Sequence, residues 1–420
     1  MLNPNTNERE LAYVVTIDEI RPIPNYDRVE HARVGGWWVI VRKDQFKVGD
    51  LAIYIEVDSK VPEKEPFMFL EKRHFKVKTL KMCKVISQGL LMSAEDFGWK
   101  TGYDAEGAPI ILWDKDATKE LPYLNEGNFL TEKLGITYAE AEDNKRKAPS
   151  VDKYKKMAQR RPNIFKKKWA QWMMRREWGK KVMFFFFGKK KDKKGGWPVG
   201  VFPGVSKTDQ ERCENMTWIL EDKTPFIVTQ KCDGSSGTYI LERKGKKKYE
   251  FYVCSRNVRM TNEEQECFYG SHNYYWEVAH KYEIEKKMRE WLEKYPTLKW
   301  ICWQGEICAP GIQKNPHNLS ETHFYCFHWT DSENGRINII DAAQNWKECG
   351  MEVVPIVDTN YILPDDFEEF KNSVDNIYYD SSVCEGNTNC LIEGYVYYKS
   401  TDPTFSFKNV SKTYLLKHNS

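Results

Sequence analysis

The sequence lacks any apolar stretch long enough to cross a membrane. Its longest apolar run is residues 182–187, whereas a membrane-spanning helix needs about 20 residues. The first residues, Met1 to Asn5, contain neither a basic region nor an apolar core, so we expect no secretory signal peptide. These absences exclude a membrane-spanning protein and favour a cytoplasmic one.

The sequence also lacks the cysteine and histidine spacings of disulfide frameworks and zinc centres. Its 11 cysteines are an odd number, spread from Cys83 to Cys390, and no two form a C-x-x-C pair. The eight histidines show no H-x-x-x-H spacing. We therefore expect reduced thiols, as in a cytosol, and no structural zinc.

A disordered chain is excluded by composition. Hydrophobic residues make up 41% of the 420 residues, which is ordinary for a globular protein, and the length predicts two or three domains. The net charge is only +3, yet residues 145–194 hold 20 Lys and Arg against three acidic residues. That segment is therefore +17 and the remaining chain −14, which predicts a polyanionic partner.

Residues 10–100 have the pattern of a small β-barrel. Apolar and β-branched runs at 11–15, 37–41 and 51–57 are separated by glycine-containing turns. Residues 102–150 are polar and mixed, and we interpret them as an extension of this first domain.

The basic segment is predicted to be helical, with Phe165, Trp169 and Trp172 on one face, and to end at Gly195-Gly196. Three interpretations stay open for it: an RNA-backbone contact, a plain domain linker or a membrane-surface helix. From residue 200 onward, strands recur around one amphipathic helix at 273–294, as in an α+β domain.

One short motif suits covalent phosphate transfer. Lys231-Cys232-Asp233-Gly234 follows a β-rich run and precedes small residues, so a strand delivers an amine into a tight turn. Alone, K-x-D-G is weak, because about one chain in ten of this length contains it by chance. Its weight comes from five segments that follow in order: Ser255-Arg256-Asn257, Gln304-Gly305-Glu306, Phe324-Tyr325-Cys326-Phe327, Glu393-Gly394-Tyr395 and Phe405-Ser406-Phe407-Lys408.

Together these segments resemble the collinear motifs of the covalent nucleotidyltransferases, the superfamily of polynucleotide ligases and mRNA capping enzymes. Residues 305–315 are similar to the third motif of RNA ligases, and residues 207–212 resemble the segment before their lysine. Residues 46–56 and 87–91 look like an N-terminal OB domain. The resemblance is closest to ATP-dependent RNA ligases with that domain order.

The resemblance implies an α+β chain of three parts. These are an OB-like β-barrel with a polar extension (1–145), a basic aromatic helical linker (146–198) and a covalent nucleotidyltransferase domain built on antiparallel sheets (199–420).

The resemblance also implies roles for the motif residues. Lys231 attacks the α-phosphate of ATP, which forms lysyl-AMP and releases pyrophosphate. Glu306 and Glu393, assisted by Asp233, hold Mg²⁺ or Mn²⁺, and Lys408 completes the catalytic set. The implied nucleotide contacts, besides Lys231, Glu393 and Lys408, are Gln230 at the adenine edge, Gly234 in the turn, Arg212 at a phosphate, Arg256 at the ribose or a phosphate, and Phe327 against adenine.

Two specific expectations follow. A lysine near its usual pKa of ~10.4 is mostly charged at neutral pH, so we expect a bound metal and Lys408 to lower the pKa of Lys231. The last motif usually reads K-x-K but here is Lys408-Asn409-Val410. The group that takes the place of the second lysine is therefore open.

The implied function is an ATP-dependent RNA ligase that activates a 5′-phosphate with AMP and joins it to a 3′-OH. We expect a monomer that acts on nicked duplex or broken structured RNA, with no membrane partner. The alternatives are a DNA ligase, a GTP-dependent capping-type enzyme and a non-catalytic RNA-binding scaffold. DNA ligases and capping enzymes usually carry the OB domain after the transferase domain, which favours the RNA ligase.

Overall fold

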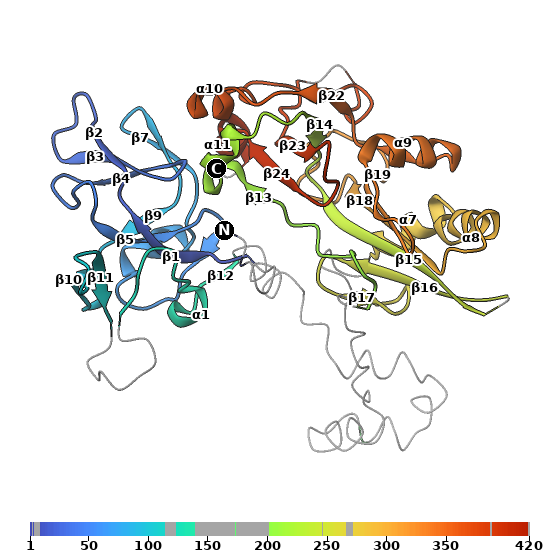
Figure 1. Cartoon of the computed structure of the whole chain (residues 1–420), viewed down its shortest axis with the longest axis horizontal. Helices are drawn as coiled ribbons and strands as arrows, with labels where there is room; N and C mark the ends of the chain where they lie inside the picture. Colours follow the sequence, from blue (N-terminus) through green and yellow to red (C-terminus); the bar gives the residue numbers. More distant parts are fainter. Residues whose placement is uncertain are drawn as a thin grey trace.

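A computed structural model describes residues 1, 3, 9–113, 123–138, 173, 201–245, 247–265, 272–386 and 389–418. Figure 1 shows two bodies side by side, an N-terminal domain in blue to teal and a C-terminal domain in green to red. Apart from Met173, the linker predicted at 146–198 lies outside the described residues. No described helix has the length and hydropathy needed to span a membrane.

The N-terminal domain consists of short strands in several small sheets. They pair in the orders β1-β5-β9, β2-β3-β4, β10-β11, β12-β6 and β7-β8. The strands are β1 (Ala12–Thr16), β2 (Glu19–Pro22), β3 (Val29–Val34), β4 (Trp37–Arg42), β5 (Leu51–Ile55), β6 (Ser59–Lys60), β7 (Leu80–Met82), β8 (Val85–Ser87), β9 (Leu90–Met92), β10 (Lys100–Tyr103), β11 (Pro109–Leu112) and β12 (Thr137–Tyr138). The helices are η1 (Met68–Arg73), η2 (Glu95–Phe97) and α1 (Thr131–Leu134).

Strand β5 lies at the centre of this domain and is buried on both faces. Ile53 packs with one apolar cluster, whereas Tyr54 packs with the other, because successive side chains point to opposite faces. Burial on both sides explains the unbroken apolar run at 51–55. Described residues of 109–113 and 123–138 are part of the same core, since Ile111, Leu134 and Ile136 are buried in it. The stretch interpreted as a polar extension therefore contains core positions.

The C-terminal domain is built on two sheets that are largely antiparallel. One sheet has the order β13-β24-β23-β14-β22, and the other has β17-β16-β15-β18-β19-β20 with β21 beside β19. The strands are β13 (Glu211–Arg212), β14 (Phe226–Lys231), β15 (Ser235–Gly245), β16 (Lys248–Ser255), β17 (Arg259–Met260), β18 (Trp300–Cys308), β19 (His323–Asp331), β20 (Gly335–Arg336), β21 (Glu352–Val353), β22 (Ile356–Tyr361), β23 (Gly394–Lys399) and β24 (Ser406–Val410). This confirms the predicted α+β class with an N-terminal β-domain.

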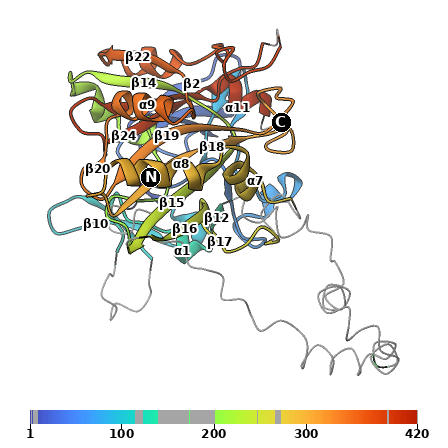
Figure 2. The same cartoon turned by 90° about the vertical axis from the view of Figure 1, so that its right-hand side faces the viewer.

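Helices cover the seven-stranded sheet on its outer face, as Figure 2 shows. The helices of the domain are η3 (Cys213–Asn215), η4 (Thr217–Glu221), α7 (Tyr274–Lys281), α8 (Ile284–Lys294), α9 (Ile339–Glu348), α10 (Phe367–Asn372) and α11 (Lys412–His418). The single helix predicted at 273–294 is wrong in one respect. Glu283 has φ +49°, in the left-handed region, and this turn divides the segment into α7 and α8.

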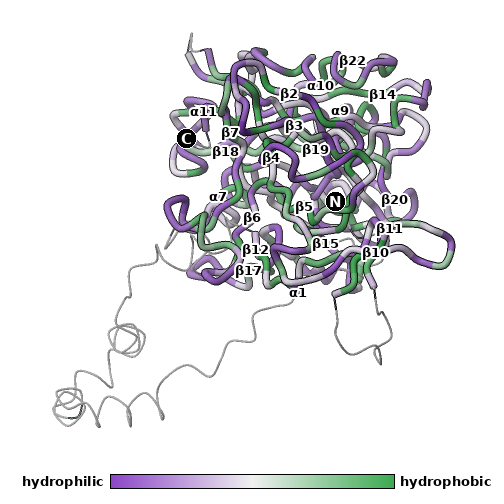
Figure 3. The backbone as a smooth tube through the Cα atoms, turned by 90° about the vertical axis from the view of Figure 1, so that its left-hand side faces the viewer, coloured by the Kyte–Doolittle hydropathy of each residue, from purple (hydrophilic) through white to green (hydrophobic). Residues whose placement is uncertain are grey.

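Alternation along the strands sends particular side chains into the space between the two sheets. In β14, Phe226 and Val228 face one apolar cluster, so Ile227 and Lys231 face the other way. In β24, Phe407 packs outward and Lys408 inward by the same rule. Hydrophilic segments gather at the outer turns in Figure 3, whereas the interior strands are mostly hydrophobic.

The two domains are joined through residues 212–215. Asn215 accepts hydrogen bonds from Tyr13 (3.0 Å) and Trp37 (2.6 Å) of the N-terminal domain and donates one to Glu56 (2.9 Å). The amide of Gly36 donates to the carbonyl of Glu214 at 2.8 Å. A Cβ on Gly36 would lie 2.6 Å from the Cα of Glu214, so the close approach of the domains requires glycine there.

A buried ion pair lies directly behind this interface. The Lys371 ammonium of α10 is 2.9 Å from Glu214, and both side chains are almost fully inaccessible. Lys371 also donates to Asn409 (3.0 Å) and to the carbonyl of Val410 (2.6 Å). The pair therefore connects the domain interface to the end of β24.

We expect Lys371→Met to destabilise the protein by about 3–5 kcal/mol, because it leaves the Glu214 carboxylate buried without its partner. The double variant Glu214→Gln/Lys371→Met should cost less than the sum of its single changes. Urea unfolding measures both. Lys286→Met is the control, since its pair with Glu283 is exposed and its loss should change stability little. An equal effect at both lysines would contradict the account.

Candidate active site

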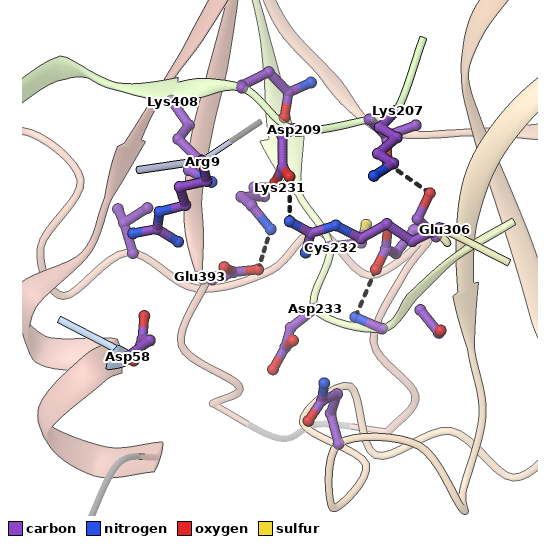
Figure 4. A pocket seen from close by; sticks show the side chains of 18 of the residues that line it. Arg9, Asp58, Lys207, Asp209, Lys231, Cys232, Asp233, Glu306, Glu393 and Lys408 are labelled. Carbon is purple, nitrogen blue, oxygen red and sulfur yellow. Dashed lines mark hydrogen bonds and ion pairs between the residues drawn. The ribbon is translucent and has the colours of Figure 1, made fainter. Parts of the chain in front are cut away.

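A cleft of about 940 Å³ lies between the two sheets and is closed on one side by the N-terminal domain. All ten residues predicted for the site line it, although they come from distant parts of the sequence. Figure 4 shows Lys231, Glu393, Asp233 and Glu306 around its centre, with Lys408 and Arg9 to one side. The N-terminal domain contributes Arg9, Asp58 and Tyr138.

Lys231 ends strand β14, and its ammonium is 2.6 Å from the Glu393 carboxylate. Register explains the contact, because Lys231 pairs with Gly394, the residue after Glu393. Burial alone would lower the pKa of Lys231, but the carboxylates of Glu393 and Glu306 outweigh it and raise this pKa above its usual value. In the site without nucleotide or metal, Lys231 is therefore held as a cation, and the lowering expected from a bound metal and Lys408 stays a prediction.

Glu306 lies on β18, opposite the turn that follows the lysine. Its Oε1 accepts a hydrogen bond from the amide of Gly234 at 3.1 Å. A Cβ on Gly234 would lie 2.3 Å from the carbonyl oxygen of Ile307, so only glycine fits between turn and strand. Burial, followed by repulsion from Glu393, raises the pKa of Glu306 to about 7, although Lys231 opposes this.

Asp233 extends the group of acids around Lys231. Burial and the charge of Glu393 raise its pKa well above the usual value, and the Tyr414 hydroxyl donates to its Oδ2. Three carboxyl groups thus surround one ammonium and crowd acidic groups into a partly buried place. That crowding of acidic groups suits a divalent cation.

No described cluster of three His, Cys, Asp or Glu side chains has the arrangement of a metal centre. Mg²⁺ is commonly held by one or two carboxylates, water and substrate phosphates, so Glu306 and Glu393 fit that ligand chemistry. The charge of Asp233 also fits, but its hydrogen bond to Tyr414 occupies one of its oxygens.

Cationic groups line the other side of the cleft. Lys408 pairs in register with Arg212, and burial, followed by the positive charge of Arg9, lowers the pKa of Lys408 to about 7. Arg212 is 5% exposed, and it contacts Asp58 at 3.3 Å through Nη2. Its Nε and Nη1 are buried and make no hydrogen bond in the described residues. Two donors are thus left for an anionic ligand.

Arg256 reaches the cleft from the turn after β16. It forms an ion pair with Asp209, and its guanidinium lies 5.7 Å from the centre of the Tyr138 ring. Burial raises the pKa of Asp209, but the charges of Arg256 and Lys408 outweigh it, so the pKa is lowered. These contacts place Arg256 where the two domains meet.

The side chains of Phe327 and Gln230 make different kinds of contact. Phe327 lines the cleft at the edge of the apolar cluster between the sheets, which suits contact with a flat ring. The side-chain oxygen of Gln230 accepts the amide hydrogen of Asp380 at 3.0 Å. Its predicted contact with the adenine edge stays a prediction, as do the ligand roles of the other site residues.

Several cleft residues were not predicted from the sequence. Arg9, Asp58 and Tyr138 lie more than 70 residues before Arg212, the first predicted site residue, so nothing near the predicted residues marks them. Asp209 and Tyr414 lie close to predicted residues in sequence, and a polar residue beside a motif was the only available signal. The buried pairing that brings them together appears only in the folded chain.

Comparison with known proteins agrees with this architecture. A family model described as an OB-fold domain matches residues 11–94, and one described as RNA ligase matches residues 224–413. Among curated proteins, no match was found. Neither model alone spans half of the chain, and the two matched stretches follow each other in the same order as the two domains of the structure.

Solved structures of a Naegleria gruberi RNA ligase share the fold across the whole chain. A mutant with ATP and Mn matches with a TM-score of 0.67 and 24% identity, covering 98% of this chain and 100% of the other. The same ligase with pyrophosphate, and a mutant with AMP and Mn, each match with a TM-score of 0.67 and 24% identity, covering 98% of this chain and 99% of theirs.

The lowered pKa of Lys408 gives a testable dependence of stability on pH. Between pH 7 and 10.5 the unfolded lysine binds a proton that the folded one does not, so stability rises with pH in this window. Below pH 7 the buried charge is fully destabilising. Near pH 6.5 the free energy of unfolding of Lys408→Met should therefore exceed that of the wild-type protein. This difference in unfolding free energy should narrow by up to about 1 kcal/mol per pH unit above pH 7.

Urea unfolding of both proteins at a series of pH values measures this difference. The control is Lys417→Met, which changes an exposed lysine. Its difference in unfolding free energy from the wild-type protein should not narrow comparably with rising pH. A difference between wild type and Lys408→Met that stays constant from pH 6.5 to 10 would contradict the burial of a charged Lys408.

Proposed function

We propose that this protein is an ATP-dependent RNA ligase whose nucleophile is Lys231. The observation that carries the proposal is the partly buried contact of Lys231 with Glu393, set between carboxylates on one side and the cations Arg212 and Lys408 on the other. A nucleoside triphosphate with a divalent cation is complementary to this charge distribution. The similar Naegleria gruberi ligase has been solved with ATP and Mn and with AMP and Mn, which supports the same choice of cofactors.

The side chains of the cleft have different roles according to their charge. Lys231 must lose a proton before its amine attacks the α-phosphate, and the adjacent Glu393 carboxylate holds that proton's hydrogen bond. Glu306 and Glu393, with Asp233 nearby, would hold the divalent cation. A cation bound there would offset negative charge on the phosphates and would favour the neutral amine of Lys231. Arg212 and Lys408 stabilise charge on the departing pyrophosphate, and Phe327 packs against the base.

Joining then takes two further transfers in the same cleft. AMP passes from Lys231 to an RNA 5′-phosphate, and an RNA 3′-OH displaces AMP. Glycine is required at position 234 for the turn that carries Lys231, because a Cβ there would lie 2.3 Å from the carbonyl oxygen of Ile307.

The proposal also covers the RNA substrate, the oligomeric state and the cellular compartment. We propose nicked duplex or broken structured RNA, because the OB-fold domain forms one wall of the cleft and such folds commonly bind nucleic acid. We also propose a monomer in a reducing, cytoplasm-like compartment, in keeping with the ten free cysteines of the described residues. The basic segment 145–194 would add backbone contacts.

Incubation with α-labelled ATP and Mg²⁺ or Mn²⁺ should leave label on the denatured wild-type protein and none on Lys231→Ala. Lys223→Ala, which changes a lysine paired with Asp365 at the surface, should label normally. Label from GTP in place of ATP would favour a capping-type enzyme. Absence of label on wild type after stripping with pyrophosphate would favour the scaffold alternative.

Joining of a nicked RNA duplex should exceed joining of the same ends as single strands, because a duplex holds both ends beside the cleft. Product yields on matched substrates, measured by denaturing electrophoresis, test this preference. A matching DNA nick gives the comparison with a DNA ligase. Equal joining of single strands would contradict the proposed preference for nicks but would leave the proposed formation of lysyl-AMP unaffected.

A further inference from the structure

The Tyr379 hydroxyl connects the backbones of the two residues that form the central ion pair. It donates a hydrogen bond to the carbonyl of Lys231 at 2.8 Å and accepts one from the amide of Glu393 at 3.2 Å. Tyr379 is 8% exposed, so these bonds are shielded from water. One hydroxyl therefore fixes the distance between the roots of the Lys231 and Glu393 side chains.

His317 holds the next part of the same turn. The amide of Asp233 donates to its Nε2 at 3.0 Å, so that nitrogen carries no hydrogen. The ring hydrogen lies on Nδ1, which donates to the carbonyl of Val383 at 2.9 Å. His317 is 1% exposed, and burial lowers its pKa to about 4, so the ring stays neutral at ordinary pH.

The two rings pack against each other, with centroids 4.2 Å apart and planes inclined by 33°. His317 comes from the loop between β18 and β19, and Tyr379 from the segment between α10 and β23. The same segment binds the Gln230 side chain through the amide of Asp380. The backbone around the nucleophile is thus held from 230 to 233 by residues outside the motifs.

We infer that His317 and Tyr379 form a clamp that positions the Lys231 turn for the transfer of AMP onto and off the lysine. The inference rests on the proposed function. Neither side chain lines the cleft, so both are positioning residues that act through Lys231, Asp233 and Glu393. A lysine has a flexible four-carbon stem, and its amine is placed accurately only when the backbone that carries it is fixed.

The clamp should affect the steps of the reaction unequally. In the first step the bond from Lys231 Nζ to the α-phosphorus forms as the bond to pyrophosphate breaks. In the second, an oxygen of the RNA 5′-phosphate attacks and the Nζ–phosphorus bond breaks. In the third, the 3′-OH attacks RNA that already carries AMP, and the amine of Lys231 makes or breaks no bond. Misplacement of Lys231 should therefore slow the first two steps more than the third.

The decisive variant is Tyr379→Phe, which keeps the ring and its packing but removes both hydrogen bonds. We expect its single-turnover rate of lysine adenylylation at saturating ATP to fall by about 10- to 100-fold, as small misplacements of reacting groups do. The ATP concentration for half-maximal rate should change little. Sealing of chemically pre-adenylylated RNA should lose clearly less than adenylylation does.

His317 is tested by a pair of variants. His317→Gln keeps an oxygen that accepts from Asp233 and an amide that donates to Val383, whereas His317→Leu keeps neither. Adenylylation should be slower in both but distinctly faster in His317→Gln than in His317→Leu. The control is Tyr378→Phe, because Tyr378 is 48% exposed and next in sequence.

Two results would overturn the clamp. One is an adenylylation rate of Tyr379→Phe equal to that of wild type. The other is a proportional loss of adenylylation and of sealing of pre-adenylylated RNA, accompanied by a lower melting temperature, which would indicate general destabilisation. A wild-type protein that forms no lysyl-AMP at all would instead contradict the proposed function, so the two failures are distinguishable. If His317→Leu does not fold, Tyr379→Phe decides alone.

Discussion

The contact between the Lys231 ammonium and the Glu393 carboxylate is the interaction on which the site depends. It joins the end of β14 to the start of β23 in a partly buried place where each charge would be costly alone. The same contact keeps the amine protonated in the nucleotide-free protein. On the proposed function, a divalent cation beside Glu393 and Glu306 would weaken this pairing and so would couple reactivity to the presence of the substrates.

A second constraint is that one cleft is shared by two domains. Arg9 and Asp58 of the OB-fold domain lie beside Arg212 and Lys408, and the buried pair Glu214–Lys371 secures the junction behind them. Val410 stands where the resemblance implies a second lysine, and Arg9, Arg212 and Lys408 line this end of the cleft. Residues of both domains therefore line the same end of the cleft.

The sequence predicted much of this arrangement because strands and motifs are local patterns. The strands around 51–57 and 226–229 are present, and all ten predicted residues line one cleft. In the nucleotide-free site the pKa of Lys231 is raised because three carboxylates come close to it in space, which local sequence patterns do not show. The sequence did not predict the clamp of His317 and Tyr379, because these side chains bind backbone groups of residues that are distant in the sequence.

The most direct test of this account is to measure the pKa of Lys231 by NMR titration of ¹⁵N-labelled lysine side chains in the nucleotide-free protein. The account predicts that Lys231 remains charged at a pH where exposed lysines have begun to lose their protons, and that Glu393→Gln makes it titrate earlier. A Lys231 that titrates well below the exposed lysines in the wild-type protein would contradict the central role of the ion pair.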